Sequence, residues 1–246
     1  MASAPHTAEV YKEKRIPKGE VKFKDFNLKD FQKPVIEFLH NNQIAILVAD
    51  PGCAKSTLAL YYALTKLRKK EYERIVITKP LVVVGDDIGF LPGTVAEKVA
   101  EYLVSYEDII DNLVGIQERE KLFREKLIVF EPVQYVRGRT FDNSLIIFDE
   151  MQGCKLHDLI TFTTRMSDTS KLIMLTDPYQ SDIKHSGVHD FLNIMLESKE
   201  EALLKIAGNI DIMELGEEFQ MRSKLIQIIY NKYKVHLKSK EEQKQN

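Results

Sequence analysis

The sequence has few cysteines, no long apolar run and no excess of charge of one sign. Only Cys53 and Cys154 occur, without metal-ligand spacing, which argues against a disulfide framework or zinc site and favours reduced thiols. The longest apolar stretches, such as 44–49, are far too short to span a bilayer, and the N-terminus lacks an apolar run of signal-peptide length. We therefore expect a cytoplasmic protein with no membrane partner.

The charges nearly cancel. The chain has 35 Lys and Arg against 37 Asp and Glu, a formal net charge of −2, so any nucleic-acid contact must come from a local basic cluster. With 246 residues, 44% of them hydrophobic, the chain has the size of one large domain. We predict a flexible N-terminal segment at 1–22, a single domain at 23–236 and a charged C-terminal tail at 237–246.

Short apolar runs alternate with longer helix-patterned segments. Because these runs are continuous rather than alternating, they predict strands buried on both faces, as in a parallel sheet covered by helices. The fold class is therefore α/β, with a mostly parallel sheet and helices on both faces. An insertion of loop and helix at about 85–125 follows the second strand. The predicted strands are 44–49, 74–78, 126–130, 144–148, 171–175 and 209–215.

The segment ADPGCAKS (49–56) lies between the first predicted strand and a predicted helix. This is the context of a phosphate-binding loop, in which Lys55 reaches the β and γ oxygens and the Ser56 hydroxyl ligates Mg²⁺. Ala54 departs from the usual glycine. If Ala54 must adopt a positive φ, the strain costs about 1–2 kcal/mol, which weakens such a site without abolishing it. Taken alone, the segment also fits an ordinary strand-to-helix turn with a surface lysine.

Two later strands also end in polar residues. SLIIFDEMQ ends in Asp149 and Glu150, one of which suits the Mg²⁺ shell and the other the activation of water. KLIMLTDPYQ ends in Asp177 and Gln180, and Gln180 suits a role in sensing the γ-phosphate or positioning water. Parallel strands end at one edge of a sheet, so these groups should face the same crevice as Lys55. The alternatives are a solvated Asp-Glu turn and an ordinary proline-containing turn.

Five segments in this order resemble PhoH-like ATPases, which are similar to the nucleotide-binding half of superfamily 1 helicases. They are ADPGCAKS, ITKPLVVVGDDIGFLPGTVAEKV, YVRGRTFDNSLIIFDEMQ, TDPYQSDI and MRSKLIQIIYNKY. GFLPG and RGRTF are more specific to the family than the phosphate loop is. The resemblance covers about residues 30–235 and implies a RecA-like P-loop NTPase core, ATP and Mg²⁺ as cofactors, and a single-stranded RNA or DNA partner.

The resemblance also implies residue roles. Ser56 and Asp149 would hold Mg²⁺, Glu150 would be the general base, and Gln180 would have a coupling role. Gln32 stands where related ATPases place a glutamine on adenine, which would favour ATP over GTP, although it also fits a surface glutamine on an amphipathic helix. Ala54 and Thr176, each in place of a common glycine, are departures from the family pattern. The predicted nucleotide-binding set is Gln32, Pro51, Gly52, Cys53, Ala54, Lys55, Ser56 and Thr57.

The basic residues nearest the predicted crevice are Lys79, Arg137 and Arg139. Gly138 between two arginines suggests close approach of the backbone to an anion such as a nucleic-acid phosphate. Alternatively, the arginines pair with carboxylates such as Glu131 or contact the nucleotide itself.

Arg222 precedes the last predicted helix, close to a position where PhoH-like proteins carry an arginine. Phosphoryl transfer gains from a cation at the γ-phosphate, and the chain has one RecA-like domain, so Arg222 must act within its own subunit or from a neighbour. We favour a neighbour, and with it a homo-oligomer, possibly a hexameric ring as the resemblance implies. The predicted activity is ATP hydrolysis, with catalytic roles for Lys55, Glu150, Gln180 and Arg222. The alternatives are a slow or non-hydrolysing ATP-binding module and a small-molecule kinase.

Overall fold

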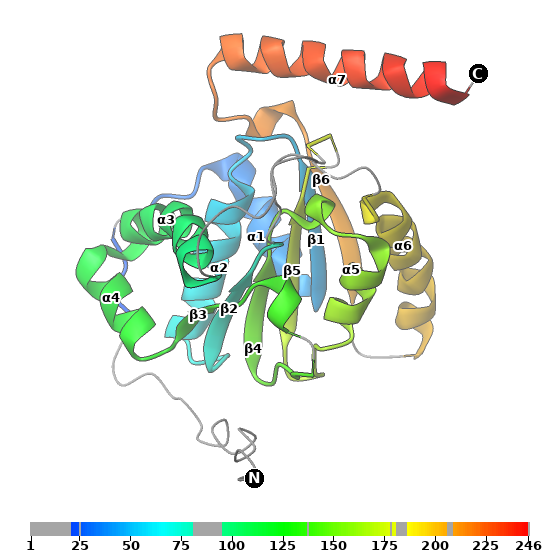
Figure 1. The fold of residues 1–246 in the computed structure, drawn as a ribbon. Coiled ribbons are helices and arrows are strands. Elements are labelled where there is room, and N and C mark those ends of the chain that lie inside the picture. Colours follow the sequence, from blue (N-terminus) through cyan, green and yellow to red (C-terminus); the bar gives the residue numbers. More distant parts are fainter. Residues whose placement is uncertain are drawn as a thin grey trace.

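Six strands form one sheet (Figure 1) in the computed structural model, which describes residues 21–24, 26–80, 95–136, 138–177, 179–180, 186–205 and 209–245. The strands are β1 (Ile44–Ala49), β2 (Arg74–Thr78), β3 (Ile128–Phe130), β4 (Ser144–Phe148), β5 (Lys171–Thr176) and β6 (Ile210–Leu215). Their order across the sheet is β3-β2-β4-β5-β1-β6, with parallel pairing throughout. The predicted α/β fold class with a parallel sheet is confirmed.

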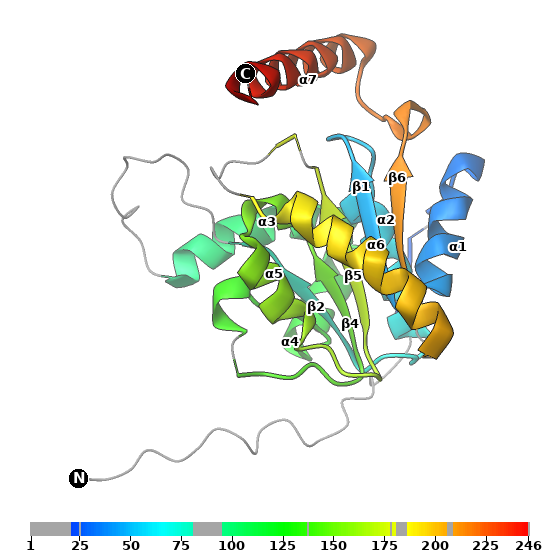
Figure 2. The same ribbon diagram turned by 90° about the vertical axis from the view of Figure 1, so that its right-hand side faces the viewer.

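Helices cover both faces of the sheet. They are α1 (Lys33–Asn41), α2 (Lys55–Arg68), α3 (Val95–Val114), α4 (Ile116–Arg124), α5 (Leu156–Thr163), α6 (Val188–Lys205) and α7 (Lys224–Gln245). Helices α1 to α4 lie on one face, and α5 and α6 on the other (Figures 1 and 2). Within the described ranges, no helix combines the length and the apolar character needed to cross a bilayer.

The strands are buried on both faces because their side chains point alternately to two apolar cores. In β1, Ala45 and Leu47 join the core under α1 to α4, while Ile44 and Ile46 join the core under α5 and α6. Both faces therefore need apolar residues, which accounts for the continuous apolar runs in the sequence.

Element boundaries differ slightly from those predicted. Strand β3 begins at Ile128 rather than at residue 126, because Lys126 has φ +54° and forms the turn that follows α4. Helices α3 and α4 occupy most of the predicted insertion, and residues 85–93 lie outside the described ranges. Helix α7 continues to Gln245, so most of the segment predicted as a tail is its last turns. Val21, in the segment predicted to be flexible, is buried in the first core. The domain boundaries themselves stay a prediction.

The carboxyl edge of the sheet gathers the polar segments. Strands β4, β5 and β1 are neighbours in the sheet, and the chain segments that follow them all begin at this edge. Adjacent parallel strands that end together place their following loops side by side, the usual location of a ligand site in such folds. Helix α7 crosses the same edge (Figures 1 and 2).

Candidate nucleotide site

The phosphate loop, residues 49–56, joins β1 to α2, which begins at Lys55. Lys55 folds back over the loop: its Nζ donates to the carbonyl oxygens of Ala49 at 2.6 Å and Asp50 at 3.1 Å. The loop therefore lies beside both the N-terminus of the 14-residue helix α2 and the Lys55 ammonium. Both carry positive charge, so the arrangement suits binding of phosphate oxygens.

Ala54 has φ +56° and ψ +25°, the left-handed conformation that the sequence analysis identified as a source of strain. A Cβ in this region costs about 1–2 kcal/mol relative to glycine. The loop therefore keeps the backbone shape that glycine normally provides, despite the alanine. The positive φ considered for this position is confirmed, and its effect on nucleotide binding stays a prediction.

Gly52 has φ +91°, and the side chains of Gln220 and Arg222 leave no room for a Cβ at this position. A Cβ built there would lie 2.4 Å from Gln220 Oε1 and 2.6 Å from Arg222 Cγ. Met221 donates its backbone N–H to Gly52 O at 3.0 Å, and Gln220 Nε2 donates to Pro51 O at 3.0 Å. Residues 220–222 thus form a wall of the phosphate loop within the same chain, and the structure places Arg222 beside that loop.

Ser56 and Asp149 meet where a metal ion is expected. Ser56 Oγ donates to Asp149 Oδ2 at 2.8 Å, and the Tyr106 hydroxyl of α3 donates to the same oxygen. The described residues contain no group of three or more His, Cys, Asp and Glu that could hold a metal ion. A hydroxyl and one carboxylate are the small donor set that Mg²⁺ takes together with phosphate oxygens and water, so these residues fit Mg²⁺.

Glu150 follows Asp149 and adopts φ +55°, which turns the chain sharply at the end of β4. Its carboxylate accepts a hydrogen bond from Gln152 Nε2 and lies 4.0 Å from Lys79 Nζ. Burial, reinforced by the neighbouring Asp149 carboxylate, raises the pKa of Glu150, while Lys79 and Gln152 lower it. A carboxylate with a raised pKa is a stronger base, as proton abstraction from water requires.

Gln152 connects Glu150 to the turn after β5. It is buried, and its Oε1 accepts from Thr176 Oγ1 at 3.1 Å and from the Asp177 backbone N–H at 3.2 Å. Gln180, predicted to have the coupling role, is exposed, and its backbone N–H donates to Asp177 O. The structure therefore shows a direct polar link between the two strand ends through Gln152, a residue given no role from sequence.

Asp177 lies buried at the same edge. Burial raises the pKa of its carboxyl group, and hydrogen bonds from the Tyr230 hydroxyl at 2.6 Å and the Tyr179 backbone N–H at 3.1 Å lower it. Lys234 on the same helix as Tyr230 reaches Asp50 Oδ2 at 2.6 Å.

Three residues of the site, Tyr230, Lys234 and Tyr106, were not predicted from the sequence. The only signal for the first two was their spacing of four residues, which places both on one face of a helix.

The remaining predicted residues are those assigned from sequence to adenine or to nucleic acid. Gln32 is buried, its Oε1 accepts from the Lys29 backbone N–H at 3.1 Å, and the adjacent Phe31 ring packs edge-on against Phe219, next to Gln220. Arg139 forms an ion pair with Glu131 at 2.5 Å, the alternative that the sequence left open. Arg137 lies outside the described residues. Nucleic-acid contact at Lys79, Arg137 and Arg139 stays a prediction.

The parallel sheet, with β5 inserted between the phosphate-loop strand β1 and the acidic strand β4, defines a P-loop protein of RecA-like architecture. The chain belongs to the PhoH-like protein family, whose model matches residues 27–234. It is 30% identical to a PhoH-like protein of Bacillus subtilis over 202 residues, which cover 82% of this chain and 61% of that protein. It is also 30% identical to protein PhoH of Escherichia coli K12 over 200 residues, which cover 80% and 55%. The chain thus spans little more than half the length of these relatives.

Solved structures with a similar arrangement include the Pyrococcus furiosus Hef helicase domain, with a TM-score of 0.45 and 14% identity over 76% of this chain and 38% of that one. Another is the Pif1 helicase of Candida albicans, with a TM-score of 0.38 and 16% identity over 85% and 44%.

Proposed function

We propose that this protein hydrolyses ATP in a Mg²⁺-dependent reaction. The observation that carries the proposal is the 2.8 Å contact of Ser56 with Asp149, because it joins the phosphate loop to the strand end that carries Glu150. A hydroxyl, a carboxylate and a second, basic carboxylate beside one phosphate loop are the groups that ATP hydrolysis needs.

Binding of ATP begins at Lys55 in this proposal. Its ammonium exchanges the carbonyl oxygens of Ala49 and Asp50 for the β and γ oxygens of the nucleotide. Ser56 and Asp149 would hold Mg²⁺, which would supply positive charge to the phosphate oxygens. Gln32, on the flank of the loop, contacts adenine and gives a preference for ATP over GTP. The other loop residues, Pro51, Gly52, Cys53, Ala54 and Thr57, shape the phosphate cradle.

Glu150 accepts a proton from the attacking water in the next step. The water oxygen bonds to the γ-phosphorus, the bond to the β-γ bridging oxygen breaks, and ADP and phosphate leave. Gln152 keeps the Glu150 carboxylate in place through its hydrogen bond. Arg222, whose stem packs on Gly52, brings its guanidinium to the γ-phosphate from within the same chain.

A second candidate is an ATP-binding module with little or no turnover. The positive φ of Ala54 favours it, since strain in the phosphate loop weakens the site. The two candidates are separated by measuring phosphate release from Mg²⁺-ATP by the wild type, with Glu150→Gln as the blank. Release above the blank supports hydrolysis, and nucleotide binding without such release supports the second candidate.

Three further assignments belong to this proposal. Single-stranded RNA or DNA is the partner, which the same assay tests by adding each polymer and looking for faster phosphate release. A homo-oligomer, possibly a hexamer, is the assembly, tested by sedimentation with and without Mg²⁺-ATP. The cytoplasm is the location, with which the free thiols of Cys53 and Cys154 agree.

A further inference from the structure

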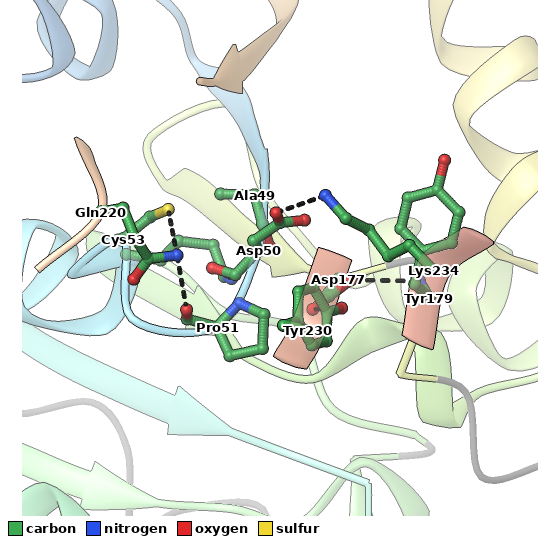
Figure 3. A network of polar contacts seen from close by, with 10 residues as sticks. Ala49, Asp50, Pro51, Cys53, Asp177, Tyr179, Gln220, Tyr230 and Lys234 are labelled. Atoms are coloured by element: carbon green, nitrogen blue, oxygen red, sulfur yellow. Dashed lines mark hydrogen bonds and ion pairs between the residues drawn. The ribbon is translucent and has the colours of Figure 1, made fainter. Parts of the chain in front are cut away.

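Helix α7 is tied to the candidate site by two polar contacts (Figure 3). Lys234 Nζ binds Asp50 Oδ2 at 2.6 Å, and Asp50 belongs to the phosphate loop. One helical turn earlier, the Tyr230 hydroxyl donates to Asp177 Oδ2 at 2.6 Å, and Asp177 follows β5. Both contacts join residues distant in the sequence, and both end on carboxylates at the carboxyl edge of the sheet.

Apolar packing contributes little to the attachment of α7. The large apolar side chains of this helix are mainly on its exposed sides, including Leu225 at 66%, Ile226 at 41%, Ile228 at 59%, Ile229 at 58% and Val235 at 65% exposure. The position of α7 over the site therefore depends on the polar contacts of Tyr230 and Lys234.

The contact between Lys234 and Asp50 is sheltered from water. The side chains are 24% and 25% exposed, and the Lys234 ammonium lies 5.4 Å from the Tyr230 ring centroid and 5.8 Å from that of Tyr179. Aromatic faces attract a cation, and partial burial reduces screening, so this pair is stronger than an exposed one.

Asp50 presents a problem for the proposed site. A triphosphate adds several negative charges to the loop, and the Asp50 carboxylate belongs to that same loop. Like charges at short range oppose binding unless a cation neutralises one of them. Lys234 is the residue that binds the Asp50 carboxylate.

We infer that Lys234 and Tyr230 are positioning residues of the nucleotide site, Lys234 acting through Asp50 and Tyr230 through Asp177. This inference rests on the proposed function, because it concerns how that site binds ATP. Docked α7 also fixes Arg222, which lies two residues before the helix and whose carbonyl oxygen accepts from Gln227 Nε2 at 2.7 Å. Lys234 thus sets nucleotide affinity, while Tyr230 sets the arrangement of the strand end that faces the reaction.

The test of Lys234 is a double-mutant cycle with Asp50, read as affinity for Mg²⁺ and an ATP labelled with a fluorophore on its ribose. Lys234→Met should weaken binding about tenfold, within the range for contacting charged residues. Lys234→Arg should restore most of the loss, and Asp50→Asn should largely cancel the effect of Lys234→Met. Lys232→Met, an exposed lysine of the same helix, is the matched control and should bind like the wild type.

The test of Tyr230 separates turnover from affinity. Tyr230→Phe removes only the hydroxyl that binds Asp177, so kcat should fall several-fold with little change in KM. Tyr233→Phe, an exposed tyrosine of α7, should change neither.

Two failures are distinguishable. The proposed function stands if the wild type binds the labelled ATP and Lys55→Ala does not. In that case the Lys234 assignment is overturned if Lys234→Met binds ATP like the wild type. It is also overturned if Asp50→Asn leaves the loss of affinity in Lys234→Met unchanged. A kcat unchanged by Tyr230→Phe overturns the Tyr230 assignment in the same way. If the wild type and Lys55→Ala bind equally, or neither binds, the proposed function fails and the inference fails with it.

Discussion

The Arg222 side chain packs directly on Gly52 of its own phosphate loop, so that a Cβ on Gly52 would lie 2.6 Å from Arg222 Cγ. The segment is held there by the hydrogen bond from Met221 N–H to Gly52 O. Sequence reasoning favoured an arginine supplied by a neighbouring subunit. The contact agrees with the other possibility, which we propose: an arginine that reaches the site within its own chain.

Arg222 acting within its own chain makes a prediction about mixed subunits. Lys55→Ala and Arg222→Ala should each be inactive, and a mixture of the two should stay inactive, because no subunit then has both residues. Phosphate release after verified mixing is the measurement. Recovery of activity in the mixture would show that Arg222 is supplied by a neighbour.

Ala54→Gly should increase ATP affinity or turnover by a few-fold up to about tenfold, since glycine adopts the φ of +56° without strain of about 1 kcal/mol. Lys70→Gly is the matched control, because Lys70 has φ +58° in the turn after α2, outside the site. Both changes relieve a positive φ, but only the first should alter nucleotide binding. An unchanged or lower affinity of Ala54→Gly would show that strain at this residue does not limit the site.

Gln152→Leu should lower kcat and destabilise the fold. Thr176 Oγ1 and the Asp177 N–H would lose their buried acceptor, which costs about 1–3 kcal/mol in the free energy of unfolding. Glu150 would also lose the donor that orients it. Denaturant unfolding and phosphate release check both effects, with Gln117→Leu on the exposed surface of α4 as the control. Full turnover in Gln152→Leu would remove Gln152 from the mechanism.

The pH dependence of turnover should reflect Glu150. A general base works only when deprotonated, and burial and Asp149 raise the pKa of Glu150. The acidic limb of kcat/KM should therefore lie at higher pH than for an ordinary carboxylate. Lys79 lowers that pKa, so Lys79→Met should move the limb to still higher pH, whereas Lys79→Arg should leave it in place. An acidic limb that does not move in Lys79→Met would contradict the role of Glu150 as the base.

The fold was predictable because a sheet buried on both faces requires continuous apolar runs, and the runs at 44–49, 74–78 and 144–148 match β1, β2 and β4 residue for residue. The start of β3 at Ile128 was not predictable, because the left-handed turn at Lys126 lies at the beginning of the predicted run and no glycine marks it.

The candidate site was predictable where its residues lie in one segment or end neighbouring strands, as Lys55, Ser56 and Asp149 do. Its remaining parts depend on docking of distant elements. Lys234 and Asp50 are 184 residues apart, and Tyr106 and Asp149 are 43 apart. Such pairs follow from how α7 lies over the carboxyl edge of the sheet and how α3 packs against it, which no local pattern specifies.

The central claim is that Glu150 makes this nucleotide site a hydrolytic one. The most direct measurement is a single-turnover experiment in which each protein is loaded with γ-labelled ATP, Mg²⁺ is added, and bound ATP and released phosphate are followed together. Lys55→Ala should bind no ATP. The wild type should convert its bound ATP to ADP and phosphate, while Glu150→Gln should bind ATP equally well and retain it intact. Equal conversion by the wild type and Glu150→Gln, or ATP retained intact by the wild type, would contradict the claim.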